Sequence, residues 1–147
     1  LQDCSQCPIH PERKNLFHDY VEKHSNLLKR NGIEPALMMT WAYKDKPEMT
    51  SQLAKEYTVA GNKNNVLVIP VGLAYANSTR IHPEIDLYTS DRRHPSKAGT
   101  YLSACVMFAS VFQTSPVGNY YTFDLDKNIA RNLQKIAWTT HQEYYEN

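Results

Sequence analysis

Two short apolar runs, separated by a helical stretch, most constrain the fold of this 147-residue chain. Residues 36–41 form one run, and residues 66–69 form a second, β-branched run that Pro70 closes. Between them, from Pro47 to Gly61, apolar residues recur at helical spacing, and the glycine is expected to end that helix. Two strands joined through a helix pair in parallel, so the pattern predicts an α/β fold with a parallel sheet.

Further helical segments surround these two strands. One is expected to stop at Gly32, a short one to cover residues 71–80, and two long ones to begin at the capping residues Ser96 and Asp126. This is more helix than a two-stranded sheet can cover, so we expect additional strands. They are expected before Leu1, which itself is interpreted as the end of a strand.

Composition excludes several classes of protein. Sixteen Lys and Arg balance fifteen Asp and Glu, which argues against a general nucleic-acid-binding surface. We find neither an apolar run of about 18 residues, as a membrane span needs, nor a Gly-rich phosphate loop. We therefore expect no nucleic acid, no membrane span and no cofactor, and the oligomeric state stays open. Residues 1–147 are interpreted as a single, partial domain with a C-terminal amphipathic helix over residues 126–146.

The three cysteines give little indication of the compartment. Cys4, Cys7 and His10 have a spacing seen in metal sites, but a structural zinc site needs four ligands and no second pair follows. We therefore predict no metal. An odd number of cysteines does not define a disulfide framework, and Cys105 lies in an apolar helical stretch as a small core residue.

The most informative segment carries Asp91 and His94 three residues apart, directly before Pro95 and the helix cap Ser96. A turn of this spacing can direct the carboxylate at the Nδ1 proton of the imidazole, which leaves Nε2 free to take a proton from a nucleophile. Pro95 favours an extended backbone at His94, so the ring is expected ahead of the helix. The alternative is a solvated pair of turn residues.

The stretch Asp91-x-x-His94-Pro95-Ser96-x-x-Gly99-x-Tyr101-Leu102 resembles the last conserved block of the SGNH (GDSL-type) hydrolases. The resemblance extends upstream through residues 39–41 and 68–72, and downstream through residues 112–117 and 133–138. It implies a three-layer α/β/α fold of flavodoxin-like type and a serine esterase that hydrolyses small acyl esters, including acetyl esters of carbohydrates. Asp91 and His94 would complete its Ser-His-Asp triad.

The chain departs from that family pattern at the nucleophile. No Ser follows a strand with a Gly before it, and the family's oxyanion blocks have no clear match. We expect the missing strands and the nucleophile to lie N-terminal to Leu1, and the isolated chain to be inactive. The alternative is a non-catalytic module of the same fold, used in carbohydrate binding or assembly, that has lost the nucleophile.

Two more residues are candidates for the site. Gln2 would donate to the oxyanion in place of the family's Asn. Trp41 would follow the first strand and stack on a sugar ring; the alternative is a rim or core aromatic. The chain begins without Met or an apolar leader, so either a leader has been removed or the chain starts inside a larger domain. The resemblance favours a secreted or periplasmic location.

Overall fold

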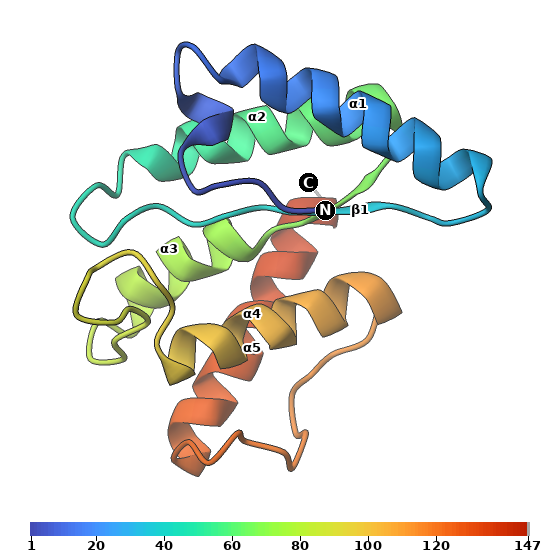
Figure 1. The fold of residues 1–147 in the computed structure, drawn as a ribbon. Coiled ribbons are helices and arrows are strands. Elements are labelled where there is room, and N and C mark those ends of the chain that lie inside the picture. Colours follow the sequence, from blue (N-terminus) through green and yellow to red (C-terminus); the bar gives the residue numbers. More distant parts are fainter. Residues whose placement is uncertain (147) are drawn as a thin grey trace.

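A small parallel sheet lies between two layers of helices in the computed structural model, which describes residues 1–146 (Figure 1). Strand β1 (Ala36–Met38) pairs in parallel with β2 (Leu67–Ile69), with Leu37 opposite Val68. The predicted α/β class and parallel pairing are therefore confirmed. Both strands are shorter than the apolar runs that predicted them.

Helices cover both faces of the sheet. One layer contains α1 (Lys14–Arg30) and α2 (Met49–Asn64), preceded by the short 3-10 helix η1 (Cys7–Ile9). The opposite layer contains α3 (Val71–Ile81), α4 (Lys97–Phe112) and α5 (Lys127–Glu146) (Figure 1). No helix within residues 1–146 is long and apolar enough to cross a lipid bilayer.

The first residue extends the sheet on the side of β1 that β2 does not occupy. The Leu1 amino group donates to the carbonyl of Ala36, and the Met38 N–H donates to the carbonyl of Leu1. This alternation is the hydrogen-bond pattern of a parallel pair. Leu1 therefore pairs as the end of a strand would, as predicted.

Alternating side chains of the strands enter two separate cores. Leu37 and Val68 pack with α1 and α2, in a core centred on Leu53 and Tyr57. Ile69 packs on the opposite face, in the larger core formed by α3, α4 and α5. Successive residues of a strand point to opposite faces, so the sheet separates the two cores.

Helix α2 continues past the glycine that was expected to end it. It ends instead at Asn64 and is capped by Asn65, whose φ of 50° and ψ of 56° place it in the left-handed region. Gly61 lies inside the helix because of packing: a Cβ at this position would lie 2.3 Å from a methyl group of Val68. The glycine brings α2 close to the sheet.

The expected starts of the last two helices are confirmed. The Ser96 hydroxyl accepts a hydrogen bond from the Gly99 N–H at 3.2 Å at the start of α4. Asp126 accepts from the N–H groups of Asn128 and Ile129 at the start of α5. Near its other end, α5 returns to the sheet, where the Tyr145 hydroxyl donates to the carbonyl of Val68.

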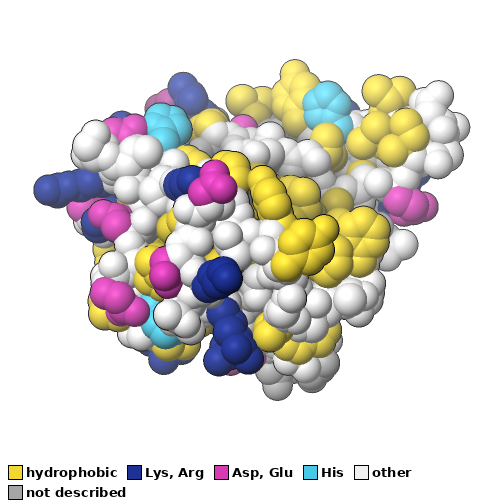
Figure 2. All heavy atoms as spheres, turned by 90° about the horizontal axis from the view of Figure 1, so that it is seen from below, with side chains coloured by type: hydrophobic (Ala, Val, Ile, Leu, Met, Phe, Trp, Pro, Cys, Tyr) yellow, Lys and Arg dark blue, Asp and Glu magenta, His cyan; other side chains and the backbone are white. Residues whose placement is uncertain are grey.

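Some large apolar residues of the helices are exposed. Leu16 and Leu27 of α1 are each more than half exposed, although Phe17 and Val21 on the same helix are buried. Phe112, at the end of the largely apolar helix α4, is 65% exposed. Figure 2 views the molecule from the side of α4 and α5 and shows hydrophobic side chains gathered on this face. Only part of each apolar helix face therefore packs within residues 1–146.

Candidate active site

The segment that follows β1 and the loop between α3 and α4 meet beyond the carboxyl end of the sheet (Figure 1), where open parallel sheets bind their ligands. The segment after β1 contacts the loop that precedes α4. The Trp41 indole N–H donates to the carbonyl of Arg93 at 2.9 Å, and the Lys44 N–H donates to the carbonyl of Arg92 at 3.0 Å. These two bonds join segments about fifty residues apart in the sequence.

The loop that carries Asp91 and His94 is a tight hairpin. Its stem is an antiparallel bridge between Tyr88 and Pro95, and the Thr89 N–H donates to the carbonyl of His94 at 2.9 Å. Arg92 has a φ of 62°, in the left-handed region that closes such turns. The hairpin therefore places the side chains of Asp91 and His94 side by side.

The predicted contact between these two side chains is present. Oδ2 of Asp91 lies 2.5 Å from Nδ1 of His94. The other carboxylate oxygen, Oδ1, accepts from the backbone N–H groups of Arg93 at 2.8 Å and His94 at 2.9 Å, and from the Thr89 hydroxyl at 2.9 Å. Both oxygens are thus fixed, and the carboxylate cannot rotate away from the imidazole without losing several bonds.

These donors hold Asp91 in its ionised form. The hydrogen bond from the His94 ring, followed by the backbone N–H groups, lowers the pKa of Asp91 far below its ordinary value. An ionised carboxylate at Nδ1 keeps the proton on that nitrogen and leaves Nε2 as the basic atom. The His94 side chain is 77% exposed, so its ring is accessible from solvent.

The start of α4 anchors the end of the hairpin. Besides capping the helix, the Ser96 hydroxyl donates to the carbonyl of Asp86 at 2.7 Å. Gly99, in the first turn, allows the helix to approach the hairpin stem, since a Cβ there would lie 2.3 Å from the carbonyl oxygen of Leu87. Ser96 and Gly99 therefore help to hold the position of the Asp91–His94 pair.

Trp41 contacts the hairpin through its indole N–H. It is 8% exposed, and Tyr75 stacks on its ring with 4.8 Å between centroids and 12° between planes. One face is thus already covered, and the N–H is engaged by Arg93. This placement favours the core or rim aromatic over the sugar-stacking role.

Gln2 lies at a different place from the Asp91–His94 pair. It lines a cavity of about 580 Å³ between the N-terminal segment and α1, together with Leu37 and Tyr57. Neither Asp91 nor His94 lines this cavity. The structure therefore does not bring the expected oxyanion donor together with the expected base.

No nucleophile accompanies the imidazole within residues 1–146. None of the described hydroxyl or thiol groups is hydrogen-bonded to Nε2 of His94. The hydroxyl of Ser96, two residues after His94, is hydrogen-bonded to Asp86 and Gly99. Cys105 is buried, and its burial raises the pKa of the thiol to about 11, so it stays protonated.

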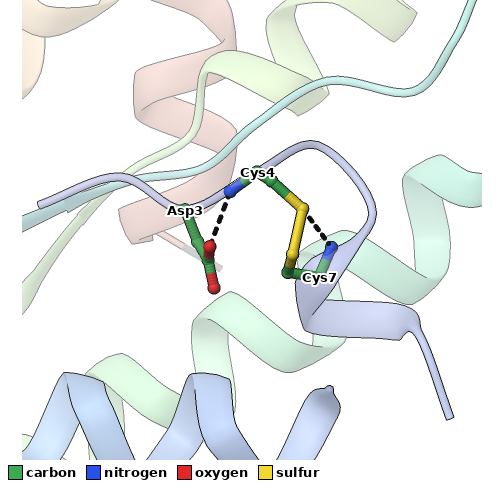
Figure 3. Close-up of side chains that lie close together, drawn as sticks. All are labelled: Asp3, Cys4 and Cys7. Atoms are coloured by element: carbon green, nitrogen blue, oxygen red, sulfur yellow. Dashed lines mark hydrogen bonds between the residues drawn. A yellow bond between two sulfur atoms is a disulfide. The ribbon is translucent and has the colours of Figure 1, made fainter. Parts of the chain in front are cut away.

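A disulfide between Cys4 and Cys7 was not predicted (Figure 3). It closes a small loop directly after the paired residue Leu1, and Asp3 accepts a hydrogen bond from the Cys4 N–H at 2.7 Å. The third candidate metal ligand, His10, instead accepts from the Glu12 N–H through Nδ1. With the two sulfurs bonded to each other, this segment does not form a zinc site.

The donors to Asp91 were also missed, although a local signal for them exists. An Asp that begins a turn commonly accepts from backbone N–H groups two and three residues later, which are those of Arg93 and His94 here. The Thr89 hydroxyl needs the hairpin geometry, which residue spacing alone does not provide. Tyr43, whose ring lies under the Arg93 guanidinium at 4.9 Å, belongs to a distant segment.

Comparisons with known proteins show the fold but no family. No family model matches the chain, and no curated protein matches it. A solved structure, a DUF4886 family protein from Bacteroides uniformis, is similar, with a TM-score of 0.75 and 18% sequence identity. The similarity covers 97% of this chain and 60% of that one. The chain therefore shares its α/β fold with that protein and spans 60% of its length.

Proposed function

We propose that this chain carries the acid–base part of a serine esterase site of the SGNH type. The observation that supports it is the Asp91–His94 pair: a carboxylate fixed by four hydrogen bonds, with an imidazole whose Nε2 is open to solvent. Its position at the carboxyl ends of parallel strands is where open α/β sheets bind their ligands. The three-layer arrangement agrees with that fold type.

In this proposal His94 is the general base. Nε2 takes the proton of a Ser hydroxyl while that oxygen attacks the ester carbonyl, and Asp91 stabilises the imidazolium that forms. The same nitrogen returns the proton to the departing alcohol, and a water molecule then releases the acyl group from Ser. The Ser and its oxyanion donors are supplied from outside residues 1–147.

The proposed substrates are small acyl esters, with acetyl esters of carbohydrates as a candidate class. The support is the exposure of the imidazole: His94 sits on an open edge, so a polymeric sugar chain can pass over it without entering a cavity. Gln2 and Trp41 do not support a substrate class. Gln2 lines a separate cavity, and one face of the Trp41 ring is covered by Tyr75.

Hydrolysis of p-nitrophenyl acetate tests the proposal in the polypeptide that includes the residues encoded before Leu1. We expect His94→Gln to lower kcat by about 10³-fold or more, and Asp91→Asn by about 10²–10⁴-fold. His82→Gln is the matched control, because His82 lies at the start of the same loop and its Nδ1 is 3.1 Å from Glu84. It should leave kcat unchanged.

Two outcomes would contradict the proposal. One is full activity in His94→Gln. The other is robust turnover by residues 1–147 alone that His94→Ala abolishes but no Ser substitution affects, because the nucleophile would then not be a serine. A folded full-length protein with no esterase activity and no labelling by a fluorophosphonate would favour the non-catalytic module.

A further inference from the structure

We propose that the Cys4–Cys7 disulfide is a reversible thiol–disulfide exchange site whose reduction by a thiol loosens the Asp91–His94 hairpin. The proposal does not depend on whether the site hydrolyses esters. Three observations carry it: the accessibility of the disulfide, a cation beside one sulfur, and a chain of contacts from the disulfide loop to the hairpin.

The disulfide is accessible from two sides. Cys4 is exposed, and Cys7 lines the cavity of about 580 Å³ between the N-terminal segment and α1. An exposed sulfur is open to in-line attack by an external thiolate. The third cysteine, Cys105, is buried in the larger core and does not take part.

A guanidinium selects the direction of exchange. Nη1 of Arg13 lies 3.8 Å from Sγ of Cys7, and Arg13 also lines the cavity. A positive charge beside a sulfur favours its thiolate form, which makes that sulfur the better leaving group. The Cys7 N–H donates to Sγ of Cys4 at 3.0 Å (Figure 3), but of the two cysteines only Cys4 is exposed. Cys4 is therefore the sulfur that an external thiolate attacks, and Cys7, beside Arg13, is the one that leaves.

The exchange is balanced with a dithiol as the reductant. Its first thiolate forms a bond to Sγ of Cys4, the Cys4–Cys7 bond breaks, and Cys7 departs as a thiolate. The second thiol of the reductant then displaces Cys4 from the mixed disulfide. The reductant leaves as a cyclic disulfide, and two electrons and two protons have passed to the protein.

A short series of contacts connects this loop to the hairpin. Gln6, inside the disulfide loop, donates through Nε2 to the Tyr43 hydroxyl at 2.8 Å. The buried Tyr43 ring lies under the Arg93 guanidinium, with 4.9 Å from Cζ to the ring centroid. Arg93 in turn donates its backbone N–H to Asp91. Opening the disulfide frees Gln6, and with it one support of this series.

Thiol counting and hydrogen exchange test the proposal in buffer without denaturant. Dithiothreitol should release two reactive thiols from the native protein, those of Cys4 and Cys7. Reduction should also speed amide exchange in residues 3–8 and 89–94 by roughly threefold or more, while α5 stays unchanged. In Gln6→Ala, which keeps the disulfide, exchange in residues 89–94 should no longer depend on reduction.

A second variant tests the leaving group. Arg13→Gln should slow reduction by dithiothreitol about 3–10-fold, whereas Arg30→Gln, an exposed substitution at the far end of α1, should not. The proposal is overturned if reduction proceeds only as fast as global unfolding, or if faster exchange stays within residues 3–8. Reduction of Arg13→Gln at the unaltered rate would overturn the direction of attack.

Discussion

Asp91 is the residue on which the candidate site depends. It is exposed, yet one carboxylate oxygen accepts from three donors and the other contacts the His94 ring. An exposed ion pair usually contributes little, because water competes for both partners. Here the hydrogen bonds orient the carboxylate, which engages Nδ1 of His94 and leaves Nε2 free.

The pKa of Asp91 gives a direct prediction. Because the folded protein lowers this pKa, the hydrogen bonds to the ionised carboxylate stabilise the folded state at pH values above the unfolded pKa of about 3.9. The resulting stabilisation is lost only as the pH falls through the lower, folded value. We expect the Asp91 carboxyl carbon to show no NMR titration step between pH 7 and about 4.

Thr89→Val is the companion measurement, since it removes one donor and leaves the backbone donors in place. The pKa of Asp91 should then rise toward its ordinary value. A titration step for Asp91 at or above about pH 3.9 in the unaltered protein would contradict the described geometry.

At the scale of elements, the junction between the hairpin and α4 positions the site. The Ser96 side chain makes two hydrogen bonds there: it accepts from the Gly99 N–H and donates to the carbonyl of Asp86. Loss of a helix cap removes a partner from an N–H group that the helix cannot satisfy itself. The same change frees the stem of the hairpin.

Ser96→Ala should lower the free energy of unfolding by about 1–2 kcal/mol, as urea denaturation can measure. Ser90→Ala is the matched control: Ser90 is exposed at the tip of the same hairpin, and its change should be within about 0.5 kcal/mol. Equal effects of the two substitutions would show that the cap does not hold the junction.

Most elements were predictable from local patterns, and the exceptions have identifiable causes. Ser96 and Asp126 marked helix starts because capping is a local preference. Gly61 misled because glycine serves both to end helices and to permit close approach, and only the contact with Val68 distinguishes the two. The Asp91–His94 contact was foreseeable because the two residues are three positions apart, whereas the bond from Trp41 to Arg93 joins residues 52 positions apart.

At the scale of the molecule, a buried ion cluster connects the first two helices. Glu56 of α2 contacts Lys14 at 2.6 Å and His18 at 2.9 Å, both on α1, and its side chain is 8% exposed. Burial acts to raise the pKa of Glu56, but the hydrogen bonds from Lys14 and His18 outweigh it and hold the pKa below its ordinary value. Nothing local in the sequence indicates this cluster.

Glu56→Gln should lower the free energy of unfolding by about 1–2 kcal/mol at pH 7. Since the folded pKa of Glu56 is lowered, its contribution is present above the unfolded value and is lost as the pH falls through the folded value. The variant should therefore lose less stability than the unaltered protein on acidification, measured by thermal unfolding at several pH values.

Glu22→Gln is the control for this cluster. Glu22 pairs with Lys63 at 2.9 Å between the same two helices, but both side chains are about half exposed. Its removal should change stability little, because water screens exposed pairs. If both substitutions changed the free energy of unfolding equally, the burial of Glu56 would not explain how much the cluster stabilises the fold.

The bond from Tyr145 to Val68 bears on self-association. Val68 belongs to β2, which has β1 on one side, and a carbonyl on an unpaired strand edge can accept a strand from another molecule. Burial raises the pKa of Tyr145 to about 12, so its hydroxyl keeps the proton with which it occupies that carbonyl. The end of α5 thus occupies this carbonyl with one phenol hydroxyl, where an additional strand would otherwise pair. This leaves the edge less available for edge-to-edge aggregation.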